Sequence, residues 1–214
     1  MLKKTSFFFV ILLWIAAAGV VFAQESKPLF HVIELNGVIT SPSAKYVAQS
    51  LEEATAAKAE GLIILLDTPG GLDTAMRDIA KSILNAPLPV IVYVYPSGAR
   101  AASAGVIIAQ AAHVAAMAPG TNIGAAHPVA IGLGGSGEMD KTMSQKVEND
   151  AAAYARSIAK TRGRSEEWVE KAVRKSESIT ADEALKLNVI DIVAVDIGKL
   201  VARDWLNRNG LIVA

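Results

Sequence analysis

An unbroken apolar run that ends in two glycines, GLIILLDTPGG, occupies residues 61–71. Side chains of a strand alternate between the two faces of a sheet, so a run that is apolar at every position predicts a strand with both faces covered. The glycines that follow, Gly70 and Gly71, predict a turn whose backbone N–H groups stay open to an approaching molecule. The same two glycines also suit an ordinary tight turn into a helix.

Apolar runs and helical patterns alternate along the rest of the chain. Short runs rich in Val, Ile and aromatic residues predict strands, and apolar residues spaced three and four apart predict helices. This alternation is typical of an α/β fold with a mostly parallel sheet, flanked by helices on both faces. The predicted strands are 29–35, 61–67, 90–95, 113–117 and 189–195, and the predicted helices are 43–59, 74–84, 103–112, 143–161, 166–175 and 181–187.

The composition excludes several classes of protein. Of 214 residues, 52% are hydrophobic, which is not the composition of a disordered chain. The 21 basic and 21 acidic side chains cancel, so nothing indicates binding to nucleic acid. With no cysteine and only 3 histidines, thiol chemistry is impossible and a metal cluster is unexpected. We therefore expect neither a metal nor a cofactor.

The first 23 residues have the pattern of a secretory signal peptide. Lys3 and Lys4 precede an apolar run over 7–21, and VFA at 21–23 places small residues before a cleavage point. We expect cleavage after Ala23, export across the cytoplasmic membrane, and one folded domain over 24–214. An uncleaved membrane anchor is the alternative, although the run is shorter than the roughly 20 residues that span a bilayer.

Two further segments contain side chains suited to nucleophilic chemistry. SGARAASAG, at 97–105, places Ser103 at the start of a helix, whose positive end favours a developing oxyanion. KVEND, at 146–150, places Lys146 near the start of the long helix, where a desolvated amine would act as a general base. Taken alone, each has a simpler explanation: Ser103 as an N-cap residue and Lys146 as a solvated surface charge.

Taken together, these segments resemble the serine-protease domain of the NfeD family, within the Clp protease/crotonase superfamily. The resemblance covers nearly all of the chain beyond residue 23 and runs through LLDTPGG (65–71), YPSGARAASAG (95–105), MAPGTNIGAAHPV (117–129), KVENDAAAYARSIAKTRGR (146–164) and SITADEALKLNVIDIVA (178–194). It implies a Clp protease/crotonase-like fold with Ser103 as nucleophile and Lys146 as general base. It also implies an oxyanion hole made by the N–H groups of Gly71 and Ala104, with Gly70 shaping the turn beside the substrate cleft.

His127 is the rival base, because in IGAAHPV it matches the catalytic histidine of the Clp protease subunit. A histidine base also needs a carboxylate that orients its ring. The position where the Clp subunit has its aspartate is Ser176 here, with Glu177 beside it and out of register. We therefore favour the pair Ser103 and Lys146 and expect His127 to line the substrate cleft.

The resemblance implies a secreted, ATP-independent serine endopeptidase without a cofactor. Its substrates would be apolar segments, such as the C-terminal region of a stomatin-like membrane protein. Two alternatives use the same scaffold. An acyl-CoA enzyme would direct the same N–H donors at a thioester enolate, and a non-catalytic scaffold would bind a membrane partner. The signal peptide disfavours the first alternative, because CoA is cytoplasmic.

Three structural expectations accompany this function. We expect a homo-oligomer, because superfamily members associate through helices beside the cleft and helix 143–161 carries an apolar stripe (Val147, Ala151, Tyr154, Ala155 and Ile158). We expect the glycine-rich segment 131–140 to be a loop that orders over a bound peptide. We also expect a side chain at Gly71 to block the oxyanion hole while leaving the fold intact.

Overall fold

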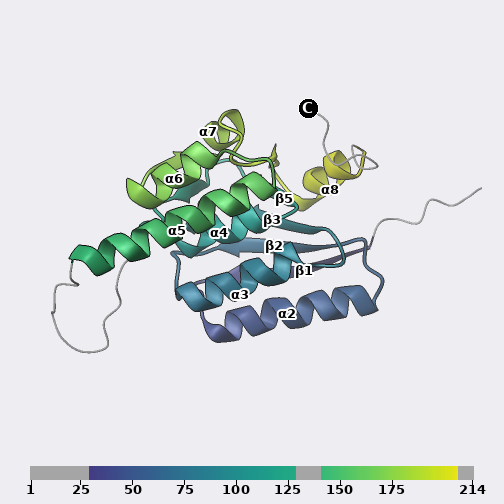
Figure 1. The fold of residues 1–214 in the computed structure, drawn as a ribbon. Helices are drawn as coiled ribbons and strands as arrows, with labels where there is room; N and C mark the ends of the chain where they lie inside the picture. Colours follow the sequence, from purple (N-terminus) through teal and green to yellow (C-terminus); the bar gives the residue numbers. More distant parts are fainter. Residues whose placement is uncertain (1–28, 129–140, 207–214) are drawn as a thin grey trace, which may run out of the picture.

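The computed structural model describes residues 29–128 and 141–206, so the predicted signal peptide (1–23) and the predicted loop (131–140) lie outside the described residues. Strands and helices alternate along the chain, as the sequence predicts (Figure 1). The strands are β1 (Phe30–Asn36), β2 (Gly61–Asp67), β3 (Val90–Val94), β4 (Arg100–Ala102), β5 (Val114–Met117), β6 (Asn122–Gly124), β7 (Ser178–Thr180) and β8 (Ile192–Val193). The helices are α2 (Ser41–Ala56), α3 (Asp73–Leu84), α4 (Ala104–Ala111), α5 (Lys141–Thr161), α6 (Glu166–Arg174), α7 (Ala181–Lys186) and α8 (Ile197–Leu206).

Five of the strands form a parallel sheet in the order β1-β2-β3-β5-β8. Strand β2 shows why both faces of this sheet are buried. Leu62, Ile64 and Leu66 belong to the larger of two hydrophobic cores. Ile63 and Leu65, which alternate with them, belong to the second core on the opposite face. The continuous apolar run of the sequence is therefore the mark of a strand covered on both sides.

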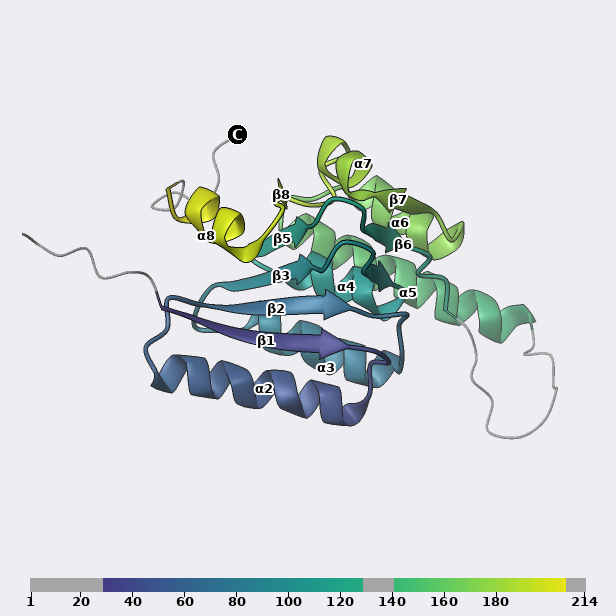
Figure 2. The same cartoon turned by 180° about the vertical axis from the view of Figure 1, so that it is seen from behind.

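Helices cover the two faces of the sheet unequally. Figure 1 shows α2, α3, α4 and α5 on one face, and Figure 2 shows α8 over the other. Leu200 of α8 is fully buried and belongs to the same core as Ile63 and Tyr93. Among the described residues, none of the helices combines the length and the apolar character that crossing a membrane requires.

A second, three-stranded sheet, in the order β4-β6-β7, is absent from the sequence prediction. Each of its strands has 3 residues, too few for an alternating pattern to be recognised. Thr68 joins it to the end of β2: the Thr68 N–H donates to the Arg100 carbonyl (2.8 Å), and the Thr68 carbonyl accepts from the Ala102 N–H (3.0 Å). The small sheet therefore carries the residue after β4, Ser103, to the carboxyl end of the main sheet.

One element differs from its prediction, and one helix places only part of its apolar stripe at the surface. The predicted last strand, 189–195, is reduced to β8, because the N–H groups of Val189 and Ile190 bind the Ala184 carbonyl in the turn after α7. The apolar stripe of helix α5 turns largely inward. Ala155 and Ile158 are buried in the chain's own core, whereas Val147 is 40% exposed, so only part of the stripe is left for a partner and the homo-oligomer stays a prediction.

Candidate active site

Ser103 lies in the sharp turn between β4 and α4. Its backbone angles, φ 52° and ψ −112°, fall in a region that residues other than glycine rarely adopt. The turn is held in part by the Ser103 N–H, which donates to the Gly124 carbonyl at the end of β6 (3.1 Å). The result is a partly exposed side chain at the N-terminus of α4, where the helix dipole is positive.

Gly70 allows Ser103 to lie against the turn that follows β2. Gly70 has a φ of +115°, and a Cβ there would lie 2.6 Å from Ser103 Cβ and 3.0 Å from Ser103 Oγ. The Thr68 hydroxyl fixes this turn, because it accepts from the Gly70 N–H (3.0 Å) and donates to the Gly37 carbonyl (2.7 Å). Gly70 and Thr68 therefore determine how close the two turns come.

Gly71 directs its own N–H away from the neighbouring backbone. It pairs with Ile39 in a parallel bridge, in which the Ile39 N–H donates to the Gly70 carbonyl (2.8 Å) and the Leu72 N–H donates to the Ile39 carbonyl (2.9 Å). The bridge therefore uses the Gly70 carbonyl and the Leu72 N–H, and the N–H of Gly71 itself points away from Ile39. No hydrogen bond between described residues occupies this N–H.

The same bridge overturns one expectation from the sequence. A Cβ on Gly71 would collide with the backbone of Ile39, not with a substrate carbonyl. The prediction that a side chain at Gly71 leaves the fold intact is therefore wrong, because it would disturb the connection between β1 and α2. The neighbouring glycine, Gly70, is the one whose absent side chain leaves room for Ser103.

A cavity of about 520 Å³ brings most of the predicted site residues together. Four of them, Gly71, Ser103, Ala104 and Lys146, line it. Ala104 is the first residue of α4, so its N–H has no partner within the helix. Most of the remaining wall is apolar, with contributions from Leu72, Met76, Ile107, Ala126, Pro128, Val147, Ala151 and Val173. A serine, a lysine and two residues with free backbone donors thus line one largely apolar cavity.

Lys146 of α5 is one of the residues that line this cavity. The side chain is exposed, and no ion pair holds its amine among the described residues. Asp150, four residues further along the helix, pairs with Arg77 of α3 instead. The amine therefore has no carboxylate partner that would fix it in the charged form.

His127 is not among the residues that line the cavity, although its neighbours Ala126 and Pro128 are. Its Nδ1 lies 3.0 Å from the Val173 carbonyl, which only accepts, so Nδ1 carries the proton and donates. Among the described residues, no carboxylate bonds to the ring, and the backbone carbonyl occupies the place that an orienting acid would take in a triad.

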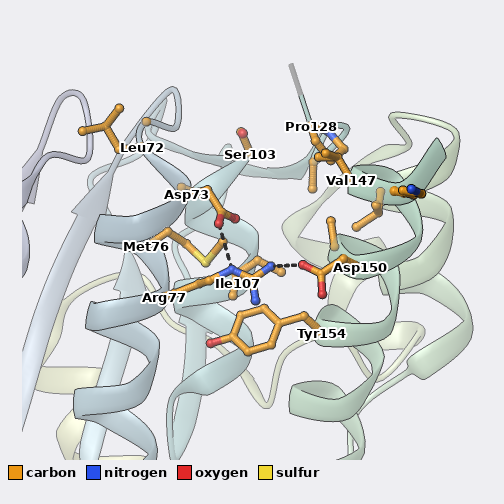
Figure 3. Close-up of a pocket in the computed structure, with 16 residues that line it drawn as sticks. Leu72, Asp73, Met76, Arg77, Ser103, Ile107, Pro128, Val147, Asp150 and Tyr154 are labelled. Atoms are coloured by element: carbon orange, nitrogen blue, oxygen red, sulfur yellow. Dashed lines mark hydrogen bonds and ion pairs between the residues drawn. The ribbon is translucent and has the colours of Figure 1, made fainter. Parts of the chain in front are cut away.

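A charged group in the cavity was not identified from the sequence (Figure 3). We call Asp73, Arg77, Asp150 and Tyr154 the Arg77 cluster. The Arg77 Nε donates to Asp73 Oδ2 (2.8 Å), its Nη2 donates to Asp150 Oδ2, and its guanidinium lies 4.3 Å from the centre of the Tyr154 ring. Burial alone would lower the pKa of Arg77, but the bonds and charges of the two carboxylates outweigh it and raise the pKa.

The sequence could have predicted one contact of this cluster, because Asp73 and Arg77 lie four residues apart on α3, a spacing typical of helix ion pairs. The contact between Arg77 and Asp150 joins residues that are 73 positions apart, so no local sequence pattern predicts it. No group of three or more potential metal ligands occurs in the part of the chain that the structure describes.

The sequence matches one family model and a curated relative over most of its length. The model of the NfeD1b N-terminal domain family matches residues 29–209. The chain is 41% identical over 178 residues to the membrane-bound protease PH1510 of Pyrococcus horikoshii, an alignment that covers 83% of this chain and 40% of that protein. The chain therefore spans about two fifths of the length of this relative.

Solved structures agree with the sequence match. Two variants of the 1510-N membrane-bound stomatin-specific protease superpose with a TM-score of 0.77 at 40% identity, over 84% of this chain and 86% and 81% of theirs. One variant has a serine replaced by alanine, and the other has a lysine replaced by alanine and a bound substrate peptide. ClpP1 from Listeria monocytogenes superposes with a TM-score of 0.63 at 20% identity, over 79% of this chain and 94% of that one, which shows a Clp protease-like fold.

Proposed function

The chain belongs to the NfeD1b N-terminal domain family, and from that premise we propose that it is a serine endopeptidase whose catalytic pair is Ser103 and Lys146. The observation that carries the proposal is the shared cavity. Ser103 and Lys146 line it together with Gly71 and Ala104, which have backbone N–H groups available for an incoming oxygen. A nucleophile, a base and an oxyanion hole are the parts that acyl transfer needs.

In this mechanism the neutral amine of Lys146 takes the proton of the Ser103 hydroxyl while Oγ attacks the substrate carbonyl. The N–H groups of Gly71 and Ala104 donate to the oxyanion of the tetrahedral intermediate, and the positive end of α4 adds to that stabilisation. Lys146 then gives the proton to the leaving amine. A water molecule, deprotonated by Lys146, hydrolyses the acyl-enzyme and regenerates Ser103.

Two observations favour Lys146 over His127 as the base. His127 is not among the residues that line the cavity, and among the described residues no carboxylate bonds to its ring. The solved relatives were studied with a serine or a lysine replaced by alanine, which matches the chemical types of the proposed pair. An apolar peptide in the cavity would exclude water from the exposed Lys146 amine and thereby favour its neutral form.

The lining of the cavity indicates the substrate class. Apolar side chains from α3, α4 and α5 surround Ser103, which suits an apolar peptide segment. Because the relatives are named stomatin-specific, we include among the substrates the C-terminal region of a stomatin-like membrane protein. The predicted signal peptide supports action outside the cytoplasmic membrane. We also propose a homo-oligomer, which light scattering of the purified protein would test.

The deciding experiment compares three variants on an apolar peptide, with circular dichroism as the check on folding. Ser103→Ala and Lys146→Ala should lose activity equally, because the two residues act as one unit. His127→Ala should keep a measurable fraction. In the unaltered protein, kcat/KM should rise with pH through a limb at or above about pH 7–8 for a lysine base, compared with about 6.5 for a histidine. An inactive His127→Ala beside an active Lys146→Ala would make His127 the base.

A further inference from the structure

Asp150 lies where it could form an ion pair with the proposed base, Lys146. It follows Lys146 by four residues on α5, so the two side chains share one face of the helix. Lysine and aspartate at this spacing form ion pairs on helix surfaces. Such a pair would hold the Lys146 amine as an ammonium ion, which cannot accept the proton of Ser103. Something must keep Asp150 away from Lys146 if Lys146 acts as a base.

We propose that Arg77 is a positioning residue that keeps the Lys146 amine free by holding Asp150; this inference rests on the proposed role of Lys146. Arg77 belongs to the facing helix, α3, and Figure 3 shows it reaching across the cavity to Asp150. Its Nη2 donates to Asp150 Oδ2 while its Nε donates to Asp73 Oδ2 (2.8 Å). The planar guanidinium can hold two carboxylates at once, which the single ammonium of a lysine does less well.

The ring of Tyr154 fixes the direction of this contact. The Arg77 guanidinium lies 4.3 Å from the ring centre, so the face of the guanidinium contacts Tyr154 while its N–H groups bind the two carboxylates. Burial raises the pKa of the Tyr154 phenol, which therefore stays neutral and adds no charge near Lys146. Asp73 and Asp150 are the two carboxylates that line the cavity, and Arg77 binds both.

Other charged groups near this part of α5 are engaged elsewhere. Glu148 points to α6, where Arg174 Nη1 donates to it (3.0 Å) and also to Asn149 (2.9 Å). Glu170 of α6 accepts from Arg174 and Arg156. On the segment after β6, the ring of His127 is bonded to the Val173 carbonyl. Asp150 is consequently the anion whose release would most directly affect Lys146.

The direction of the effect follows from the charges. With Arg77 present, two carboxylates and one guanidinium carry a net charge of −1 beside Lys146. Without Arg77 the charge becomes −2, and Asp150 is free to pair with the amine. Both changes favour the ammonium form, so the pH limb of kcat/KM should move to higher pH. For side chains that are as exposed as these, we expect a shift of about 0.5–1 pH unit, a three- to tenfold loss below the limb.

Three variants and two readouts test the proposal. The variants are Arg77→Gln, Asp150→Asn and the double variant. The first readout is the pH profile of kcat/KM for an apolar peptide. The second is the pH dependence of Lys146 acetylation by trace acetic anhydride, followed by mass spectrometry, which reports the neutral amine even in an inactive protein. Arg77→Gln should move both profiles to higher pH, and the added Asp150→Asn should bring them back toward those of the unaltered protein.

Arg174→Gln is the matched control, because it removes an arginine that also binds α5 but does not line the cavity. In this control variant, the pH dependence of Lys146 acetylation should be the same as in the unaltered protein. An unmoved acetylation profile in Arg77→Gln, or a shift that Asp150→Asn fails to reverse, would overturn the role of Arg77. A shifted acetylation profile beside an unmoved cleavage limb would instead support the control of Lys146 by Arg77 and reject Lys146 as the base.

Discussion

Replacing Gly70 by alanine tests whether the close approach of two turns determines activity. A Cβ at this position would lie 2.6 Å from Ser103 Cβ, whereas ordinary van der Waals contact begins at 3.4 Å. One of the two turns must therefore move by about 1 Å, and a displacement of that size costs on the order of 10²-fold in rate. We expect Gly70→Ala to lower kcat/KM by about two orders of magnitude, or about 2.7 kcal/mol of transition-state stabilisation.

The same substitution also carries a cost in stability. Gly70 has a φ of +115°, which an alanine adopts only with strain, at roughly 1–3 kcal/mol. A loss of activity could then reflect a loss of folded protein. Gly98→Ala separates the two effects, because Gly98 has a φ of +92° and no heavy atom within 4 Å of an added Cβ. It shares the backbone strain but not the collision with Ser103.

The assay measures kcat/KM on an apolar peptide and the free energy of unfolding by urea for both variants. Gly98→Ala should lose stability to a similar extent and keep the activity of the unaltered protein per folded molecule. Gly70→Ala should lose both. A folded Gly70→Ala protein with undiminished kcat/KM would refute the reasoning, because it would mean that Ser103 can move by about 1 Å without affecting the reaction.

Two further predictions concern stability. Burial, and then the charges of Arg162 and Arg164, lower the pKa of His113 to about 4 in the folded protein. In the unfolded chain the pKa of a histidine is about 6.5, so between these two values the unfolded chain binds a proton that the folded protein does not. The free energy of unfolding should therefore fall as the pH drops from about 6.5 to about 4. His113→Gln should flatten that part of a urea-midpoint-against-pH curve, and an equal slope in both proteins would contradict the assignment. Arg164→Met should cost about 3–5 kcal/mol, because the Arg164 side chain is 1% exposed and the change removes the ion-pair partner of Asp191. Arg174 belongs to a more exposed pair, so Arg174→Met should cost clearly less than Arg164→Met in the same urea titration, and equal losses would argue against the effect of burial.

Local patterns were sufficient for strands β1, β2, β3 and β5 and for the helices from α2 to α7, whereas β8 was predicted too long and α8 was not among the predicted helices. Strand β2 was predicted at its observed bounds, 61–67, because a strand buried on both faces needs an apolar side chain at every position. Helix α3 was predicted from 74 and begins at Asp73, since its apolar residues repeat with the helical period. The segments around Ser103 and Lys146 were also identified from the sequence, through their resemblance to one family.

Tertiary structure alone decided which of these groups meet. Strands β4, β6 and β7 each have 3 residues and pair across long stretches of chain, so their sheet leaves no periodic signal. The different surroundings of Gly70 and Gly71 depend on the bridge to Ile39, which two consecutive glycines in a sequence do not reveal. Sequence periodicity reports only which face of an element is buried. The contact between Arg77 and Asp150 arises from the packing of separate elements around one cavity, and only the folded chain contains it.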